Sequence, residues 1–277
     1  MWRGLLLALL LPVAAWGMRP LETPEAMPAS SGLVGTAWRA PLPSQPPPFV
    51  LPPGDPATLV IIIDDLGNRL KEGRQTVALP GRISVAVLPH TPHGARLAEE
   101  AHRAGKDVML HAPMSTLDHR PLGPGALTSE LSETEFRATL QAALASVPHV
   151  QGVNNHMGSG LTQKPEPMRW LMAELTARDL YFVDSRTHSA TVAAAAAAEA
   201  GLPHLSRQVF LDNVAEPEAI AERFLAAVSQ ARQRGLAVVI GHPYPETIAF
   251  LHAVLPELET QGIRLATVSE VLAGSVH

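Results

Sequence analysis

The chain has 277 residues, enough to bury the core of one large α/β domain or of two small ones. Its formal net charge of -5 provides no positive footprint for a nucleic acid, which excludes that class of partner. Cysteine is absent, so any transition-metal site must use imidazole and carboxylate ligands, and 12 histidines are available for it.

The first 17 residues have the layout of a secretory signal peptide. Arg3 supplies a positive charge, residues 4–15 are apolar, and small residues occur at Ala14, Ala15 and Gly17. The apolar run is too short for a comfortable membrane span. We therefore expect an exported, periplasmic protein with no stable membrane span after signal cleavage. An uncleaved N-terminal membrane anchor is the alternative.

Residues 18–56 are dense in proline and show no apolar periodicity. Such a composition cannot form a packed core, which predicts an extended, disordered linker. The folded domain is therefore expected to span residues 57–277. No further break in composition occurs there, so we expect a single domain.

Strand-like and helix-like segments alternate through this domain. Strands are predicted at residues 59–63, 83–88, 107–110, 149–153, 180–183, 205–211, 236–240 and 263–268. Helices are predicted at residues 69–79, 94–104, 132–146, 167–178, 193–198, 217–234 and 246–258, the third opening with a capping box at Ser132 and Glu135. This alternation predicts a mostly parallel sheet of about seven to eight strands wrapped by helices, either a barrel or a doubly wound sheet.

The first predicted strand ends in two adjacent carboxylates. Residues 59–63 are apolar and mostly β-branched, which is typical of a strand buried on both faces, and Asp64 and Asp65 follow directly. Two neighbouring carboxylates repel each other unless a cation or hydrogen-bond donors compensate. The alternative is a turn in which one aspartate caps the next helix.

Titratable or amide side chains also follow other predicted strands. They are His111, Asn154, Asn155, His156, Asp184 and His242. Each has a structural alternative, because histidines at such positions are often only hydrogen-bonded, asparagines form turns and aspartates cap helices. The carboxyl ends of parallel strands lie on one face, however, so these side chains are expected to converge. Histidines and carboxylates around an open position are typical of a catalytic zinc or related divalent metal.

Several stretches resemble the motifs of known polysaccharide deacetylases. Residues 61–67 resemble the Asp-Asp-Gly motif of NodB-type deacetylases, with Leu66 inserted before the glycine. The stretches 111–114, 154–159 and 241–243 are similar to motifs of the divergent polysaccharide deacetylase family. The resemblance covers about residues 57–272. It implies a single-domain distorted (β/α) barrel that removes N-acetyl groups from sugars with the help of a metal.

The resemblance also implies roles for individual residues. By position, Asp64 matches the general base and Asp65 the metal-binding carboxylate. His111 matches the first metal-binding histidine. His242 matches the general acid that protonates the leaving amine.

The usual second metal ligand of these deacetylases is missing. Their His-x-x-x-His pattern would place it at position 115, which is a serine here. We therefore expect His156 to replace it, with His119 as the weaker candidate. The residues expected to support the site or to bind substrate are Asn154, Asn155 and Asp184.

The implied function is an exported, metal-dependent deacetylase, with zinc as the expected metal. Its partner would be a carbohydrate, either peptidoglycan or another N-acetylated envelope glycan. The alternative is an inactive metal-binding pseudoenzyme that binds a glycan or a cell-envelope protein. A metal-dependent esterase or phosphoryl hydrolase would use the same ligands, because substrate choice depends on the shape of the loops.

Overall fold

The computed structural model describes Leu51, Gly54 and residues 56–274. All of them belong to one unit of the chain, Pro47–His277. The predicted signal peptide, residues 1–17, lies outside the described residues, as does the predicted linker, residues 18–56, apart from Leu51, Gly54 and Pro56. None of the described helices is long and apolar enough to cross a membrane.

A nine-stranded sheet forms the centre of the described structure, with the order β6-β5-β4-β3-β2-β1-β8-β7 and with β9 paired to β1. The strands are β1 Ala57–Leu66, β2 Ser84–Val87, β3 Asp107–Met114, β4 Val150–Met157, β5 Tyr181–Asp184, β6 His204–Ser206, β7 Val209–Phe210, β8 Leu236–Gly241 and β9 Ile263–Ala266. All the pairings between them are parallel. Their carboxyl ends therefore share one face, as the alternation of elements predicts.

The sheet curls into a barrel whose seam lies between β6 and β7. These strands occupy opposite edges of the sheet, yet only Arg207 and Gln208 separate them along the chain. Three consecutive Cα steps span at most about 11 Å, so the two edges must come close together. This is the predicted distorted (β/α) barrel, with nine strands instead of seven to eight. The prediction of one strand at residues 205–211 was wrong, because its two halves pair at opposite edges.

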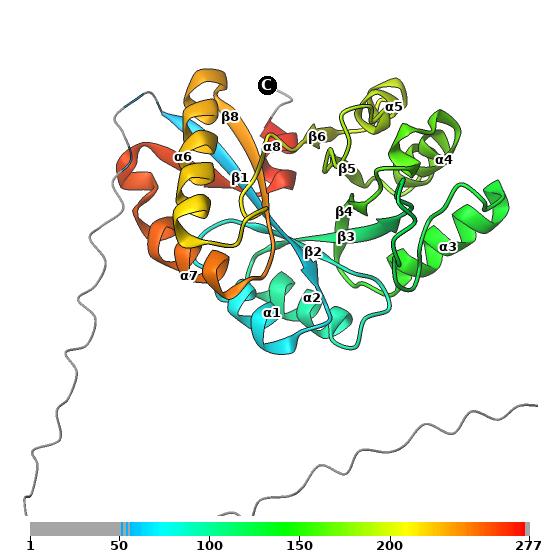
Figure 1. The fold of residues 1–277 in the computed structure, drawn as a ribbon, viewed down its shortest axis with the longest axis horizontal. Helices are drawn as coiled ribbons and strands as arrows, with labels where there is room; N and C mark the ends of the chain where they lie inside the picture. Colours follow the sequence, from blue (N-terminus) through cyan, green and yellow to red (C-terminus); the bar gives the residue numbers. More distant parts are fainter. Residues whose placement is uncertain (1–50, 52–53, 55, 275–277) are drawn as a thin grey trace, which may run out of the picture. The chain divides into compact units, whose positions relative to one another are not determined.

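Helices cover the outer face of the sheet. They are α1 Leu70–Val77, α2 Gly94–Arg103, α3 Glu133–Ala145, α4 Pro165–Thr176, α5 Ala193–Glu199, α6 Pro217–Arg234 and α7 Pro245–Val254. A further helix, α8 Val268–Gly274, lies at one end of the barrel, and 3₁₀ turns occur at Leu161–Gln163, Leu255–Glu257 and Glu259–Gln261. Helix α3 begins with the predicted capping box of Ser132 and Glu135. In Figure 1, α6 lies beside β8 and β1, and α3 lies beside β3. Helix α7 contacts α6 and α1, and α4 contacts α3, α5 and β5.

Alternate residues of each strand face two different apolar layers. On β1, Leu59, Ile61 and Ile63 pack in the large core beneath the helices, whereas Val60 and Ile62 belong to a smaller cluster inside the barrel. That inner cluster also includes residues of β2, β3, β5 and β8. The barrel interior is thus filled with side chains, and a ligand site must lie at one end of it.

Helix α8 closes the amino end of the barrel. The backbone N–H of Val268 donates to the Ser84 hydroxyl (3.1 Å), and that of Ser269 donates to a carboxylate oxygen of Asp107 (2.9 Å). Ser84 and Asp107 are the first residues of β2 and β3. The predicted strand at residues 263–268 was too long, because this helix begins at Val268. The carboxyl ends of the strands form the opposite end of the barrel.

Candidate metal centre and active site

The inward-facing side chains of β1 and β3 change from apolar to polar toward the carboxyl end of each strand. On β1 the apolar Val60 and Ile62 lead to Asp64, and on β3 Met109 leads to His111. Asn154 of β4 pairs directly with His111. Asp64 and His111 are 2% exposed and Asn154 is fully buried. Strand geometry therefore places three polar side chains on top of the apolar barrel interior.

Asp65 reaches the same site through a β-bulge. In a regular strand it would face away from Asp64, because successive side chains alternate. Its φ is +59°, however, and the register of β1 against β2 shifts between Ile63 and Leu66. The left-handed conformation costs a non-glycine residue about 1–2 kcal/mol. It turns both neighbouring carboxylates toward one point, and strain of this kind is concentrated at functional sites.

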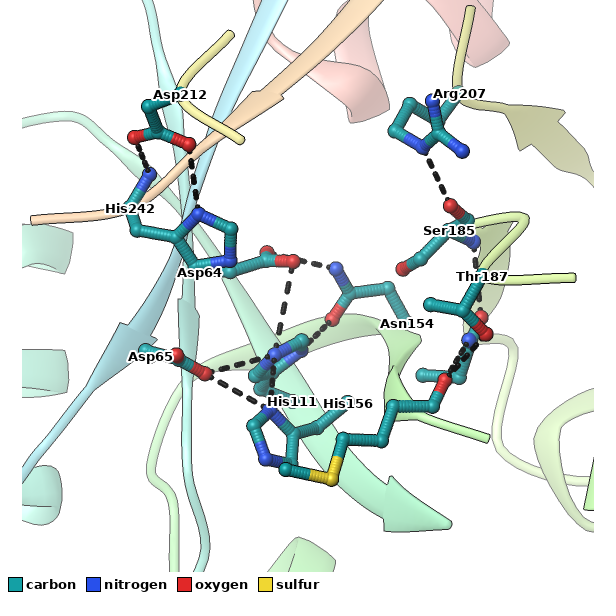
Figure 2. A network of polar contacts seen from close by, with 12 residues as sticks. Asp64, Asp65, His111, Asn154, His156, Ser185, Thr187, Arg207, Asp212 and His242 are labelled. Atoms are coloured by element: carbon teal, nitrogen blue, oxygen red, sulfur yellow. Dashed lines mark hydrogen bonds and ion pairs between the residues drawn. The ribbon is translucent and has the colours of Figure 1, made fainter. Parts of the chain in front are cut away.

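Three potential metal-ligand atoms form a small triangle at the carboxyl end of the barrel (Figure 2). Asp65 Oδ1 lies 2.9 Å from His156 Nδ1 and 3.2 Å from His111 Nε2. The two imidazole nitrogens are 3.1 Å apart. His156 belongs to β4, two residues beyond Asn154, so the ligands come from β1, β3 and β4.

The triangle has the dimensions and chemistry of a site for a divalent metal. Ligands about 2.0–2.2 Å from a tetrahedral zinc lie roughly 3.3–3.5 Å from each other, and the observed separations are only slightly shorter. Asp65 Oδ1 is buried and accepts no well-directed hydrogen bond from the described residues, although two imidazole nitrogens are near it. A cation between the three atoms would satisfy it. Asp65 and His156 are 33% and 16% exposed, which leaves one side of the triangle open.

Asn154 orients the groups around it. Its Oδ1 lies 2.7 Å from His111 Nδ1, and because an amide oxygen only accepts hydrogen bonds, Nδ1 must carry the proton. The lone pair of His111 is then on Nε2, the nitrogen that faces Asp65. The amide nitrogen of Asn154 donates to Asp64 Oδ1 (2.8 Å). One side chain therefore holds both a ligand and a neighbouring carboxylate in place.

The two adjacent aspartates differ in their affinity for protons. Burial raises the pKa of Asp64, and the charges of His111 and His242 oppose this shift only in part. Burial acts in the same direction on Asp65, but the close imidazoles of His111 and His156 outweigh it and lower the pKa of Asp65 far below its usual value. Asp65 is thus suited to remain an ionised ligand, while Asp64 is the more basic of the two.

His242 forms a second pair with Asp212, an aspartate that was not among the predicted site residues. It follows β8, and its Nδ1 lies 2.8 Å from Asp212 Oδ1. Asp212 Oδ2 accepts the backbone N–H of His242 (2.6 Å) and the hydroxyl of Thr247 (2.8 Å). Burial alone would lower the pKa of His242, but the hydrogen bond to Asp212 and its charge raise it to about 9. Figure 2 shows the His242 ring beside the carboxylate of Asp64.

Asp212 could have been found from the sequence. It comes directly after the predicted strand at residues 205–211, and position after a strand is the signal that selected the other candidates. The apolar run Phe210–Leu211 ends at this carboxylate in the same way that residues 59–63 end at Asp64.

A cleft of about 610 Å³ opens over the triangle. Asp65, His156 and His242 form part of its wall, together with Arg69 and Tyr244. Much of the remaining wall is proline: Pro89, Pro92, Pro113, Pro121, Pro124 and Pro243. Proline restricts the backbone, so these loops hold a defined shape. The volume is that of an ordinary small-ligand pocket.

Three other predicted site residues point elsewhere. Asn155 faces away from the triangle, where its Oδ1 accepts the N–H of Ser185 (2.9 Å). The carboxylate of Asp184 accepts from the backbone N–H of Arg186 (2.8 Å) and the hydroxyl of Thr191 (3.0 Å), which is the turn-capping alternative. His119 lines a separate cavity and is not part of the triangle.

The chain is similar to a known protein family and to two uncharacterized bacterial proteins. Residues 61–272 match the model of the divergent polysaccharide deacetylases. The uncharacterized protein YibQ of Escherichia coli (strain K12) is 39% identical over 200 residues, as is an uncharacterized protein of Haemophilus influenzae (strain ATCC 51907 / DSM 11121 / KW20 / Rd). Each match covers 72% of this chain, and they cover 63% and 71% of those proteins, so the chain spans less than two thirds of the E. coli relative.

The fold also occurs in a solved structure. The crystal structure of an uncharacterized protein from Agrobacterium tumefaciens C58 aligns with a TM-score of 0.76 at 20% sequence identity. The alignment covers 78% of this chain and 89% of that chain. At this identity the similarity supports the barrel fold alone.

Proposed function

Because the chain belongs to the divergent polysaccharide deacetylase family over residues 61–272, we propose that it is a metal-dependent hydrolase that removes N-acetyl groups from an envelope glycan. Peptidoglycan is the expected substrate class. We further propose that the protein is exported to the periplasm by residues 1–17, and that residues 57–277 are its catalytic domain, tethered by the proline-rich residues 18–56.

The observation that carries this proposal is the joint arrangement of a ligand triangle, a base and an acid. Asp65, His111 and His156 supply three ligand atoms within 2.9–3.2 Å of one another. Asp64 lies against the triangle, with its Oδ2 3.6 Å from His111 Nε2. His242 lies on the other side of Asp64 (Figure 2). Metal-assisted amide hydrolysis uses a metal, a general base and a general acid in one place.

The protein's own residues would divide the reaction as follows. A divalent metal, which we propose to be zinc because the ligands are imidazole and carboxylate, would polarise the acetamide carbonyl and make a water molecule more acidic. Asp64, made basic by burial, accepts a proton from the attacking water. His242 holds a proton on its ring because Asp212 stabilises the imidazolium, and it donates this proton to the departing nitrogen. Asn154 keeps the Asp64 carboxylate oriented.

A sugar would be held in the cleft beside the triangle. Tyr244 is 44% exposed there, and its ring centroid lies 5.6 Å from that of His242. A sugar ring bound against Tyr244 would place its substituents next to the general acid. Aromatic residues are otherwise few, at 4% of the chain, which favours recognition of one or two sugar units over a long stacking groove.

The test measures acetate released from N-acetylated chitooligosaccharides and from peptidoglycan fragments by the zinc-loaded protein and by Asp64→Asn. Loss of a general base lowers the rate by about 10²–10⁴-fold. We expect this loss with the metal content unchanged, because Asp64 is not one of the three ligands. Equal acetate release by the two proteins would contradict the role of Asp64.

The same assay separates the alternative functions. A pseudoenzyme would bind metal at Asp65, His111 and His156 but release no acetate from any N-acetylated glycan. An esterase would release acetate from O-acetylated xylooligosaccharides and leave the N-acetylated ones intact. The presence of both the Asp64 base and the Asp212–His242 pair favours turnover.

A further inference from the structure

A basic cavity lies at the seam of the barrel, away from the ligand triangle. We call it the seam pocket, and it has a volume of about 330 Å³. Its lining consists of Arg186, His188, Ser189, Arg207, Gln208, Gln230 and Arg234. Every one of these side chains can donate hydrogen bonds, and none of them is a carboxylate. In a chain with a net charge of -5, three arginines around one cavity are a marked local excess of positive charge.

The hydrogen bonds that hold Arg207 in the seam pocket go to uncharged carbonyl groups. Arg207 is half-buried, and its guanidinium donates to the carbonyls of Ser185 (2.5 Å) and Arg186 (2.7 Å). It also lies 3.7 Å from the ring centre of Phe210. These contacts fix its orientation and leave its charge in place. Among the described residues, Arg186, Arg207 and Arg234 form no ion pair with a carboxylate.

Two buried acids, Asp184 and Asp64, attract Arg207, and both already accept hydrogen bonds from other groups. The buried carboxylate of Asp184 attracts Arg207, but its oxygens accept hydrogen bonds from Arg186 N–H and the Thr191 hydroxyl. Burial and the like charge of Arg186 together lower the pKa of Arg207 to about 10. An anion in the pocket would relieve this repulsion.

The turn that carries Arg186 is held in an unusual conformation. Arg186 has a φ of +47°, a left-handed value that is uncommon outside glycine. The turn is fixed on its other side by the Ser185 N–H, which donates to Asn155, and by the Thr187 hydroxyl, which donates to the Met157 carbonyl (2.7 Å). Figure 2 shows this series of contacts running from β4 to Arg207. The backbone turn at Arg186 and the guanidinium of Arg207 are therefore held in place before any ligand arrives.

We propose that the seam pocket binds a phosphoryl group. Guanidinium groups match the oxygens of phosphate in pairs, and three arginines with one histidine suit a dianion. A carboxylate, with a single charge and two oxygens, would leave most of these donors unused. The volume accommodates a phosphate together with part of the molecule that bears it. The proposal does not depend on hydrolase activity, because no residue of the pocket belongs to the ligand triangle or to the Asp212–His242 pair.

Arg234 is the most informative residue to change. It is the last residue of α6, it is exposed, and it takes no part in the contacts between Arg207 and β4. Arg234→Gln removes one charge from the pocket and keeps the helix. Arg186→Asn is a second variant, since asparagine tolerates a left-handed conformation. The matched control is Arg169→Gln, which removes an exposed arginine from α4, outside the pocket.

The experiment is isothermal titration of the full-length protein with inorganic phosphate and, separately, with acetate at the same ionic strength. We expect phosphate to bind the wild type, Arg169→Gln and His111→Ala alike, and Arg234→Gln and Arg186→Asn to bind it at least about tenfold more weakly. His111→Ala distinguishes the pocket from phosphate bound at the metal centre. Equal phosphate affinity in Arg234→Gln, Arg186→Asn and the wild type would overturn the proposal, and so would equal binding of acetate and phosphate.

A vesicle arm identifies the source of the phosphoryl group. In one outcome, the wild type sediments with phosphatidylcholine vesicles that contain phosphatidic acid but not with pure phosphatidylcholine vesicles. If Arg234→Gln does not sediment with either, the result supports phosphoryl binding in the seam pocket, with a lipid as the ligand. Binding of inorganic phosphate without binding of vesicles would support phosphoryl binding in the seam pocket, with a soluble molecule as the ligand. Binding of neither probe by the wild type would overturn it.

Discussion

Two buried aspartates at opposite ends of the barrel have different surroundings. Asp64 and Asp107 are both 2% exposed, and burial raises the pKa of each. At the amino end, Asp107 Oδ2 accepts from the hydroxyls of Ser84 (3.4 Å) and Tyr181 (2.9 Å) and from the N–H of Ser269 (2.9 Å). Helix α8 begins directly over it. These neutral donors tie the helix to the sheet.

At the carboxyl end, Asp64 has one neutral donor, Asn154, and its other neighbours can carry charge. Asp65, His111 and His242 all act on its pKa, and a cleft opens beside them. Burial of a carboxylate is therefore not by itself a sign of function. The combination of titratable neighbours and an open cleft distinguishes the proposed site at Asp64 from the structural contacts of Asp107 with helix α8.

The largest contrast between the two ends is expected from removing one side chain at each. His111→Ala takes away one of three ligands, so bound zinc should fall below about a tenth of the wild-type stoichiometry, and acetate release should fall with it. Asp107→Ala leaves buried donors without a partner, so its free energy of unfolding should drop by about 1–3 kcal/mol while zinc binding persists. Metal analysis and urea denaturation measure the two effects.

His119→Ala is the matched control for His111→Ala. It removes a histidine that the sequence offered as an alternative ligand and that lies in another cavity. Zinc content should remain that of the wild type. Loss of zinc in His119→Ala together with its retention in His111→Ala would contradict the proposed metal centre.

A smaller effect is expected from Asn154→Ala. Removing this side chain deletes the acceptor that fixes the tautomer of His111 and the donor that holds Asp64. Partners that orient metal ligands typically contribute 10–100-fold, so zinc affinity should fall by about that factor. Competition with a chelator measures it. An unchanged affinity would show that Asn154 is not needed to orient His111.

The smallest effect is expected from Asp212→Asn and depends on pH. With the pKa of His242 raised to about 9, its proton is present below that pH and is lost as the pH rises through it, so kcat/KM should fall on the alkaline side near pH 9. Asparagine removes the negative charge, and the pKa should move down toward the ordinary value of about 6.5. The alkaline limb should then shift to lower pH, with a loss of kcat/KM of roughly 10–30-fold near pH 8. An unshifted limb would exclude His242 as the titrating acid.

The candidate site was predictable to the extent that it follows strand ends. Position directly after a predicted strand was the criterion for a site residue. It identified Asp64, Asp65, His111, His156 and His242, which the structure brings to one end of the barrel. This criterion did not distinguish side chains on the inner face of a strand from those on its outer face. Asn154 and His156 face the interior, whereas Asn155, between them, and Asp184 face away.

Strand lengths were predicted less well, for a physical reason. The apolar runs that mark β3 and β4 stop before the polar motifs, but their pairing continues from His111 opposite Asn154 to Met114 opposite Met157. The ladder is held by backbone hydrogen bonds, which do not depend on whether the side chains are apolar. Helix α6, with an amphipathic pattern and a terminal glycine, has the predicted bounds of residues 217–234.

The apolar periodicity of the sequence determined the alternation of parallel strands and helices, and its short motifs resembled a family whose fold is a distorted (β/α) barrel. Periodicity alone left the barrel and the doubly wound sheet open, because both consist of the same local elements. Only the tertiary structure decided which neighbours share a site. The bulge at Asp65 depends on the pairing of β1 with β2. The partnership of Asp212 with His242 joins residues 30 positions apart. The seam pocket exists because the strands around Arg207 pair at opposite edges of the sheet. Each of these features depends on contacts between distant segments, which no local pattern records.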